Sequence, residues 1–300
     1  QAPAALFKFA ELVHKSGFPP GVINIITGFA EPCGRVITSH PKVARVAFTG
    51  GTEVARHIVR NTAENFAHLS LELGGKSPML VFDDCNIEGA VNGIIAGNFG
   101  ASGQSCVAGS RVFIQRSIHS EIISKIKERS KSIIVGDPRD EKTVVGPMIN
   151  EAAAIRVEEW VNEAVAGGAK VLTGGKRNGS YYEPTVLADV AVDAKVSCNE
   201  VFGPVMLVNS ISSTQEGFDI VNDSPFGLQA GVFTHDVQTA FLAHSELEVG
   251  GVIIGDVPTF RSDQMPYGGV KASGVGKEGL LHAMRDLTHE RILVLSDLAL

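Results

Sequence analysis

Residues 44–75 read ARVAFTGGTEVARHIVRNTAENFAHLSLELGG, and this stretch decides the fold class. Residues 44–49 and 68–73 are apolar runs typical of strands, and residues 52–64 between them have the pattern of a helix. Each strand ends in a glycine pair, Gly50-Gly51 or Gly74-Gly75, which permits a tight turn. A strand, a helix and a second strand joined in this way indicate a parallel sheet with right-handed crossovers.

The same alternation extends along the chain in both directions. Upstream, the sequence predicts a helix at 4–16, a strand at 22–27 and a short helical stretch at 34–39. Downstream, strands are expected at 79–82, 111–115, 170–172, 205–211, 229–233, 251–254 and 291–295, and helices at 87–99, 118–133, 150–166, 214–222 and 237–247. Residues 261–279 are rich in glycine and predict irregular structure. The fold class is therefore α/β, a partial doubly wound sheet followed by a second α/β unit, with ligands bound at the carboxyl ends of the strands.

Composition excludes several classes of protein. The chain has 300 residues, 44% of them hydrophobic and 20% charged, which is typical of a soluble globular protein. A formal net charge of −7 argues against nucleic acid as a partner, because phosphate binding needs a basic face. No apolar run approaches the roughly 18–20 residues of a membrane-spanning helix, so we expect no membrane partner.

The four cysteines lie far apart, at Cys33, Cys85, Cys106 and Cys198. This spacing favours neither a disulfide framework nor a zinc site, and we expect no metal. Nothing like a basic segment followed by an apolar one opens the chain, so the cytoplasm is the expected compartment.

Cys106 has the most conspicuous setting of the four cysteines. It lies in Gly100-Ala-Ser-Gly-Gln-Ser-Cys-Val-Ala-Gly109, between an expected helix and an expected strand. The glycines let the backbone bend and let another molecule approach the sulfur, while backbone N–H groups in such a turn can face an oxyanion. The sequence around it leaves two interpretations open, a nucleophile or a small buried apolar residue.

Glu72 is the second candidate for chemistry. It stands between Leu71 and Leu73 at the end of an apolar strand. Loss of hydration among leucines should raise the pKa of its carboxyl toward the range useful for a general base. The alternative is a carboxylate paired at the strand end, with Lys76 as a candidate partner. A nucleophilic thiol and a general base beside a doubly wound sheet suggest acyl chemistry coupled to a nucleotide cofactor.

Five segments together resemble the NAD(P)-dependent aldehyde dehydrogenases, in the order and at about the spacing of that family. They are Phe48-Thr-Gly-Gly-Thr-Glu53, Leu71-Glu-Leu-Gly-Gly-Lys-Ser-Pro78, Gly103-Gln-Ser-Cys106, Glu200-Val-Phe-Gly-Pro-Val205 and Pro266-Tyr-Gly-Gly-Val-Lys-Ala-Ser-Gly-Val-Gly-Lys-Glu278. The resemblance covers essentially the whole chain and implies an aldehyde dehydrogenase-like fold. It implies oxidation of a small-molecule aldehyde to a carboxylic acid, with hydride transfer to NAD or NADP.

The resemblance also implies roles for individual residues. Cys106 would form a thiohemiacetal and then a thioester, which Glu72 would hydrolyse by activating water. Glu278 matches a glutamate proposed as a proton relay, with a structural ion pair as the alternative. The residues expected to contact the cofactor are Gly28, Gly50, Gly51, Thr52, Leu73, Glu200 and Phe202.

Substrate contacts are expected from Gln104 and Ser105 beside the nucleophile and from Phe260, Arg261 and Tyr267 on the opposite wall. The sequence of residues 255–267 is similar to that of one branch of the family, which contains the lactaldehyde, phosphonoacetaldehyde and non-phosphorylating glyceraldehyde-phosphate enzymes. Arg261 can pair with an anionic substrate tail. The alternatives are a bond from Arg261 to Asp263 or to a partner subunit.

The resemblance places Gln1 after several of the family's cofactor-binding and oxyanion residues. We therefore expect the carboxyl-terminal three fifths of a longer enzyme, inactive or slow by itself. The expected divisions are 1–73, the end of the dinucleotide-binding domain; 74–275, the catalytic domain; and 276–300, a closing helix and oligomerisation tail. Residues 290–296 resemble a strand exchanged between subunits, which implies a homodimer or homotetramer. Two rival functions remain, a cofactor-independent thiol esterase and a non-catalytic fragment that forms oligomers.

Overall fold

The computed structural model describes residues 3–297, and the chain forms two compact units. The first comprises the chain up to Val46 together with Arg56–His68. The second comprises Ala47–Ala55 and the chain from Leu69 onward. Strand β1 (Arg45–Thr49) and helix α3 (Thr52–Asn61) contribute residues to both units.

The first unit contains α1 (Ala4–Lys15), a π-helical turn (Ala30–Gly34) and α2 (Arg35–Ser39), close to the helices expected there. The strand expected at 22–27 is wrong, because this segment has no strand structure. A strand is stable only beside a partner that accepts its backbone hydrogen bonds. No strand of the described residues pairs with this segment, and Val22 and Ile26 are exposed.

A small sheet has the order β1–β2–β14, with β2 at His68–Glu72 and β14 at Gly274–Val275. Strand β14 comes from the glycine-rich segment that was expected to be irregular. It runs antiparallel to β2 and places Gly274 opposite Glu72. This pairing brings residues far apart in the sequence to the strand that carries the candidate base.

The main sheet of the second unit has seven strands in the order β12–β11–β3–β4–β9–β8–β5. Their bounds are Gly251–Ile254, Gln229–Phe233, Pro78–Val81, Arg111–Gln115, Val205–Ile211, Thr185–Ala188 and Lys170–Thr173. Neighbours are parallel except β5 and β8, as expected of a doubly wound sheet. Sequence reasoning missed β8, a strand of four buried residues.

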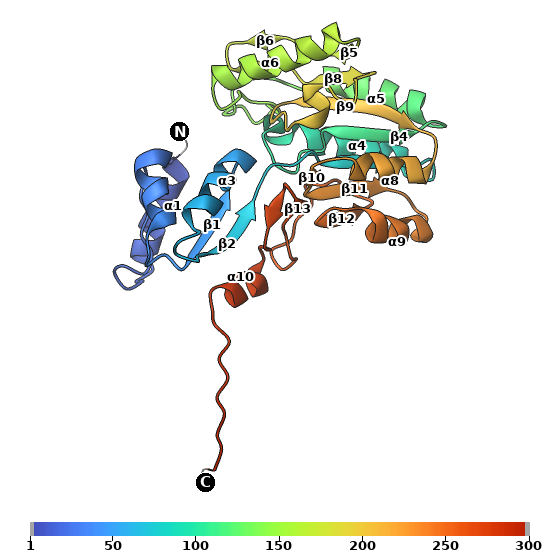
Figure 1. The fold of residues 1–300 in the computed structure, drawn as a ribbon. Coiled ribbons are helices and arrows are strands. Elements are labelled where there is room, and N and C mark those ends of the chain that lie inside the picture. Colours follow the sequence, from blue (N-terminus) through green and yellow to red (C-terminus); the bar gives the residue numbers. More distant parts are fainter. Residues whose placement is uncertain (1–2, 298–300) are drawn as a thin grey trace. The chain divides into compact units, whose positions relative to one another are not determined.

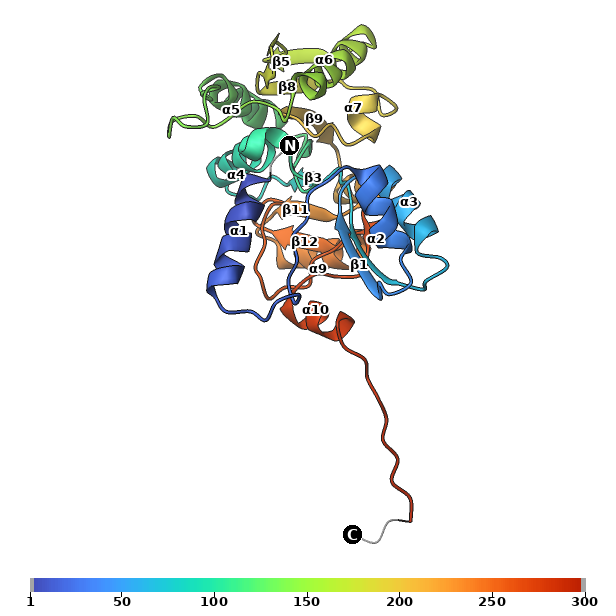
Figure 2. The same ribbon diagram turned by 90° about the vertical axis from the view of Figure 1, so that its left-hand side faces the viewer.

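Helices cover both faces of this sheet (Figure 1, Figure 2). Helices α4 (Ile87–Phe99) and α5 (His119–Lys131) pack on the face that contains Val112, Ile114 and Val208. The opposite face is covered by α6 (Glu151–Ala166), α8 (Thr214–Asn222) and α9 (Val237–Glu246). Asn86, Asn150, Ser213 and Asp236 cap the amino ends of α4, α6, α8 and α9. Each fully buried aliphatic side chain contributes about 1.5–3 kcal/mol of transfer free energy.

The remaining elements are short. They are α7 (Lys195–Cys198), α10 (Leu280–Asp286), the paired strands β6 (Arg177–Asn178) and β7 (Tyr181–Tyr182), and the paired strands β10 (Phe226–Gly227) and β13 (Val270–Lys271). The strand expected at 291–295 is wrong for this single chain, since the segment has no strand structure and Ile292 is 92% exposed. No described strand lies beside it to pair with. Between residues 3 and 297, no helix has the length and apolarity needed to cross a bilayer.

Candidate active site

A cavity of about 550 Å³ lies within the second unit at the ends of several of its elements. It is lined by the end of β1, the turn after β2, the loop before β4 and the segment before β9. The lining residues are Thr49, Gly50, Gly51, Glu72, Leu73, Gly74, Gln104, Ser105, Cys106, Glu200 and Phe202. Nine of the residues expected to act on cofactor or substrate therefore meet here, although they come from four separate stretches of the sequence.

Cys106 is held by a loop with unusual backbone geometry. A 3-10 turn (Gly100–Gly103) precedes it, and Ala101, Ser102 and Gly103 all have positive φ angles, of 49°, 57° and 67°. The Cys106 carbonyl oxygen would lie 2.3 Å from a Cβ atom on Gly75, so only glycine permits this approach. The half-buried Cys106 sulfur lies 3.5 Å from the Tyr267 hydroxyl. The loop thus presents the thiol to the cavity from a closely packed backbone.

Gly103→Ala and Gly100→Ala form a matched pair that tests this packing. A Cβ at position 103 would lie 2.1 Å from the Gly203 carbonyl oxygen, at a φ of +67° that alanine adopts with strain, whereas a Cβ at 100 meets no atom within 4 Å. We expect Gly103→Ala to lower the free energy of unfolding by about 2–4 kcal/mol. Gly100→Ala should stay within about 0.5 kcal/mol of the parent in chemical denaturation. Equal effects of the two substitutions would contradict the described loop.

Glu72 ends β2 with its carboxyl group buried and unpaired. It is 4% exposed, and neither carboxylate oxygen has a hydrogen-bond partner among the described residues. Burial raises the pKa of Glu72 to about 7, and the nearby Glu278 charge adds to the rise while Lys277 and Arg261 oppose it. Gly268 makes room for this group, because a Cβ there would lie 2.7 Å from Glu72 Oε1. The expected partner Lys76 forms no ion pair with it, so the paired alternative does not hold. A carboxyl with a pKa near 7 that faces a cavity can exchange a proton at neutral pH.

The raised pKa of Glu72 has a consequence for stability. Between pH 4.5, its ordinary pKa, and about 7, the folded state keeps a proton that the unfolded state releases. Stability from this group is therefore present at low pH and is lost as the pH rises, by about 3 kcal/mol at about 1.4 kcal/mol per pKa unit. We therefore expect the unfolding free energy of Glu72→Gln, measured relative to the parent at the same pH, to be higher at pH 8 than at pH 4.5 by about that amount. The exposed Glu141→Gln is the control and should show no such gain. Parallel pH profiles for Glu72→Gln and the parent would contradict the burial argument.

Glu200 is held against the turn that follows β2. Its Oε1 accepts a hydrogen bond from the Gly75 N–H at 3.1 Å, and a Cβ on Gly74 would lie 2.7 Å from its Oε2. Burial raises the pKa of Glu200, while the Gly75 hydrogen bond and Lys76 lower it. Phe202 follows with a φ of +50° and is partly exposed at the cavity wall. A Cβ atom on Gly51 would meet no atom within 4 Å, so there is open space beside this residue. The neighbouring Gly50 N–H donates a hydrogen bond to the Glu72 carbonyl oxygen at 3.0 Å.

Arg261 and Glu278 lie beside the cavity around Tyr267. Arg261 donates to Glu278 Oε2 at 2.8 Å, and its guanidinium lies 4.1 Å from the centroid of the Tyr267 ring. Backbone hydrogen bonds join Tyr267 and Glu278 in both directions. Among the described residues, the partner of Arg261 is therefore Glu278 and not Asp263, and both side chains remain partly exposed. This arrangement places an ion pair and an aromatic ring next to Cys106 and Glu72.

Sequence reasoning missed Ser273, which joins three segments around the site. The fully buried Ser273 hydroxyl donates to the Gly74 carbonyl oxygen at 2.7 Å and accepts from the Gly227 N–H at 3.0 Å. Its own carbonyl oxygen accepts from the Leu73 N–H at 2.9 Å. The residue stands inside the quoted segment 266–278, but a serine in a glycine-rich loop carries no local signal of burial.

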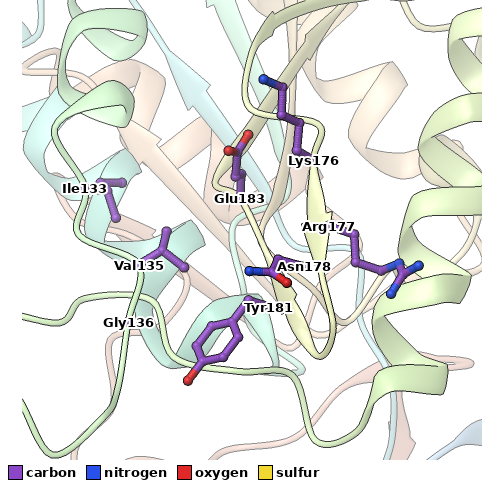
Figure 3. A pocket seen from close by; sticks show the side chains of 8 residues that line it. All are labelled: Ile133, Val135, Gly136, Lys176, Arg177, Asn178, Tyr181 and Glu183. Atoms are coloured by element: carbon purple, nitrogen blue, oxygen red, sulfur yellow. The ribbon is translucent and has the colours of Figure 1, made fainter.

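Six expected site residues do not line this cavity: Arg261, Tyr267 and Glu278, described above, and Thr52, Phe260 and Gly28. Thr52 donates to the Ala272 carbonyl oxygen at 3.3 Å, and Phe260 is an exposed residue whose carbonyl accepts from Gln229. Gly28 belongs to the first unit, where a Cβ would lie 2.3 Å from the Cys33 sulfur. Another hollow of about 550 Å³, shown in Figure 3, holds none of the expected residues. Its Arg177 is paired with Glu151 and Glu158.

Comparison with known proteins shows which sequences and structures this chain is similar to. A 3-sulfolactaldehyde dehydrogenase of Priestia megaterium is 42% identical over 294 residues, which cover 98% of this chain and 61% of that protein. An NADP(+) succinate-semialdehyde dehydrogenase of Escherichia coli is 36% identical over 95% of this chain and 60% of its own length. The crystal structure of a betaine aldehyde dehydrogenase from Staphylococcus aureus in complex with NAD+ superposes with a TM-score of 0.91 at 36% identity, covering 95% of this chain and 57% of that one.

The chain thus spans about three fifths of the length of these relatives. The sequence profile of the aldehyde dehydrogenase family matches residues 1–293, almost the whole chain. With this match, and with a solved structure of the same fold, the chain belongs to the aldehyde dehydrogenase family.

Proposed function

We propose that the protein containing this chain oxidises an aldehyde to a carboxylic acid with NAD or NADP as the hydride acceptor. The observation that carries the proposal is that a half-buried thiol, Cys106, and a buried unpaired carboxyl, Glu72, line one cavity. A nucleophile and a base are the two groups that thioester formation and hydrolysis require.

In the proposed first half-reaction, the Cys106 thiolate adds to the aldehyde carbon and a C–S bond forms. The carbonyl oxygen takes up the electron pair, and backbone N–H groups of the loop can stabilise its charge. When bound, the nicotinamide accepts the hydride that the former aldehyde carbon releases. The electron pair on oxygen restores the C=O bond, which leaves a thioester on Cys106.

In the second half-reaction, Glu72 acts as a general base on water. A carboxylate at this position takes a proton from the water as its oxygen adds to the thioester carbon. The C–S bond then breaks, the acid leaves and the Cys106 thiolate is restored. Glu278 lies close enough to raise the pKa of Glu72, and we propose that it relays the proton to solvent.

The residues of the cavity suit a dinucleotide. Gly51 leaves open space at the wall, and Glu200 is fixed by the Gly75 N–H with one carboxylate oxygen still available. Leu73 and Phe202 offer apolar surface for a nicotinamide ring. We propose that Glu200 binds the nicotinamide ribose, that Leu73 and Phe202 bind the ring, and that Gly50, Gly51 and Thr52 lie along the rest of the cofactor.

A panel of aldehydes tests this proposal. With the protein containing this chain, we expect formation of NADH or NADPH, followed by absorbance, that depends on aldehyde, cofactor and an intact Cys106; the chain alone should be slow or inactive. The rival thiol esterase would instead cleave nitrophenyl esters without cofactor and produce no reduced nicotinamide from any aldehyde. That outcome would overturn the proposed function.

We propose an anionic aldehyde as the substrate class. Arg261 is partly exposed against Tyr267, whose hydroxyl lies near the Cys106 sulfur, so it can turn from Glu278 to an anionic substrate tail. Two of the relatives above are named for sulfolactaldehyde and succinate semialdehyde, which are both anionic. Gln104, Ser105, Phe260 and Tyr267 would form the walls around the aldehyde.

Arg261→Gln should therefore separate charged from neutral substrates. Loss of a charge-assisted hydrogen bond worth about 1.5–3 kcal/mol should raise KM for an anionic aldehyde about 10-fold to 100-fold. KM for a neutral aldehyde of similar size should change less than about threefold. Steady-state kinetics with both substrates measure the difference, and equal increases would contradict the assignment of Arg261.

The remaining proposals concern the assembly and the compartment. We propose that residues 1–73, 74–275 and 276–300 act as cofactor, catalytic and closing segments, and that the exposed residues 290–296 join copies of the chain in a homodimer or homotetramer. We also propose action in the cytoplasm, because all four cysteines are free thiols, as a reducing compartment keeps them.

A further inference from the structure

A second cavity of about 310 Å³ lies on one face of the main sheet. Its floor is made of two directly paired positions of neighbouring strands, Arg111 opposite Leu207 and Phe113 opposite Asn209. The cavity lies between the core that α6 covers and the core that α8 covers. An arginine and an asparagine thus occupy a sheet face that is apolar on both sides of them.

Arg111 is the buried cation of this cavity. It is 8% exposed, and its Nε donates to the Lys76 carbonyl oxygen at 3.2 Å. Within residues 3–297, no group accepts a hydrogen bond from its two terminal nitrogens, and Arg111 forms no ion pair. Burial lowers the pKa of Arg111 to about 10, so it stays charged at neutral pH. The guanidinium lies 5.6 Å from the centroid of the Phe113 ring, and Arg111 lines the cavity. A buried charge is costly unless an opposite charge pairs with it, and the described residues supply none here.

The other ionisable groups near Arg111 change the charge of the cavity little in its depth, because Lys76 does not line it and burial lowers the pKa of Lys76 to about 7. Lys76 is fully buried with no hydrogen-bond partner for its Nζ. Asp223 and Cys198 line the cavity at exposed positions, and the Asp223 charge acts on Arg111 without a hydrogen bond between them. The negative group is therefore at the rim, while the guanidinium is at the floor.

The walls of the cavity are partly apolar and partly polar. Val190 and Ile220 supply apolar surface, and Ser197 and Ser224 supply polar surface. The volume of about 310 Å³ lies at the lower end of the range of roughly 300–1,000 Å³ for small-molecule sites. A planar fork of N–H donors at the floor matches a carboxylate, and the apolar part of the walls matches a hydrocarbon body attached to it.

We propose that this cavity binds a small organic carboxylate, with its oxygens on the Arg111 guanidinium and its apolar body against Val190 and Ile220. None of the residues that line it belongs to the cavity of Cys106 and Glu72. The site is thus distinct from the one proposed for catalysis, and its test does not depend on enzyme activity.

Protection of Cys198 from alkylation tests the site directly. Cys198 is an exposed residue of the rim, so a bound ligand should shield its thiol from N-ethylmaleimide. Benzoate is the probe, and benzamide, which is neutral and of the same shape, is its control. We expect saturating benzoate to slow modification of Cys198 about tenfold or more, measured by peptide mass spectrometry, while benzamide and the rate at Cys85 show no change.

Two variants separate the guanidinium from the cavity itself. Arg111→Gln should raise the Kd of benzoate in ligand-observed NMR about 10-fold to 100-fold, because a charged hydrogen bond is lost. If Arg111→Gln fails to fold, Ile220→Trp fills the cavity and keeps the charge, and it should abolish benzoate binding in a chain with native circular dichroism.

Three results would overturn the proposal. Equal protection by benzoate and benzamide would show that charge has no part in binding. Protection by inorganic phosphate but not by benzoate would show that the cavity does not bind a carboxylate with an apolar body. Unchanged benzoate affinity in folded Ile220→Trp would place the carboxylate elsewhere.

Discussion

Cys106→Ser should lower the rate of NAD(P)H formation about 10⁴-fold or more. A serine hydroxyl at this position stays protonated at neutral pH and adds far more slowly to an aldehyde than a thiolate does. The substitution removes little volume, and the cavity retains Glu72, Glu200 and Phe202, so the fold and cofactor binding should persist. Steady-state rates and cofactor titration by fluorescence measure the two properties separately.

Cys85→Ser is the matched control for this substitution. Cys85 is also a free, half-buried cysteine, but it packs against the core under α4, and burial raises the pKa of its thiol to about 11. It should react slowly with iodoacetamide, whereas Cys106 should react fast and selectively. Full activity of Cys106→Ser, or equal labelling of both thiols, would remove Cys106 from the chemistry.

Glu72→Gln should separate the two half-reactions. The amide cannot take a proton from water, so the steady-state rate should fall about 10²-fold to 10⁴-fold. The first half-reaction does not use this base, and a burst of one NAD(P)H per site should remain in stopped-flow absorbance.

The pH dependence gives a second signature of Glu72. Its pKa of about 7 means that the base form is gained as the pH rises through 7, so the parent rate should increase across that range and then level off. Glu72→Gln should lose this rise. Glu141→Gln, at an exposed position, should keep both the rate and the pH profile of the parent. Loss of the burst together with the steady-state rate would show that Glu72 acts before the thioester forms.

The sequence predicted regular elements where periodicity was strong. The bounds of α4, α8, β4, β9, β11 and β12 agree with their expected ranges to the residue, because long apolar strands and capped helices carry their own signals. Segments 22–27 and 291–295 have the same apolar character and form no strand. Strand structure depends on a neighbour, which a local pattern does not contain.

The sequence predicted which residues gather at the candidate site, but it did not predict the contacts between them. Cys106 stood out through its glycine-rich loop, Glu72 through its place among leucines at a strand end, and Glu200 through the family resemblance alone; all three line one cavity. The partnership of Arg261 with Glu278 joins positions 17 residues apart across an irregular segment. The role of Ser273 and the burial of Arg111 likewise arise from tertiary packing, since neither residue type is ordinarily buried.

The central claim is that Cys106 holds the acyl group while Glu72 releases it, and mass spectrometry of the trapped intermediate tests it most directly. Glu72→Gln is mixed with an aldehyde and NAD+ or NADP+, quenched in acid and digested. The peptide that carries Cys106 should gain the mass of the acyl group, in an amount equal to the burst, and hydroxylamine should remove it. A burst with no acyl mass on Cys106, or acyl mass on another residue, would contradict the account.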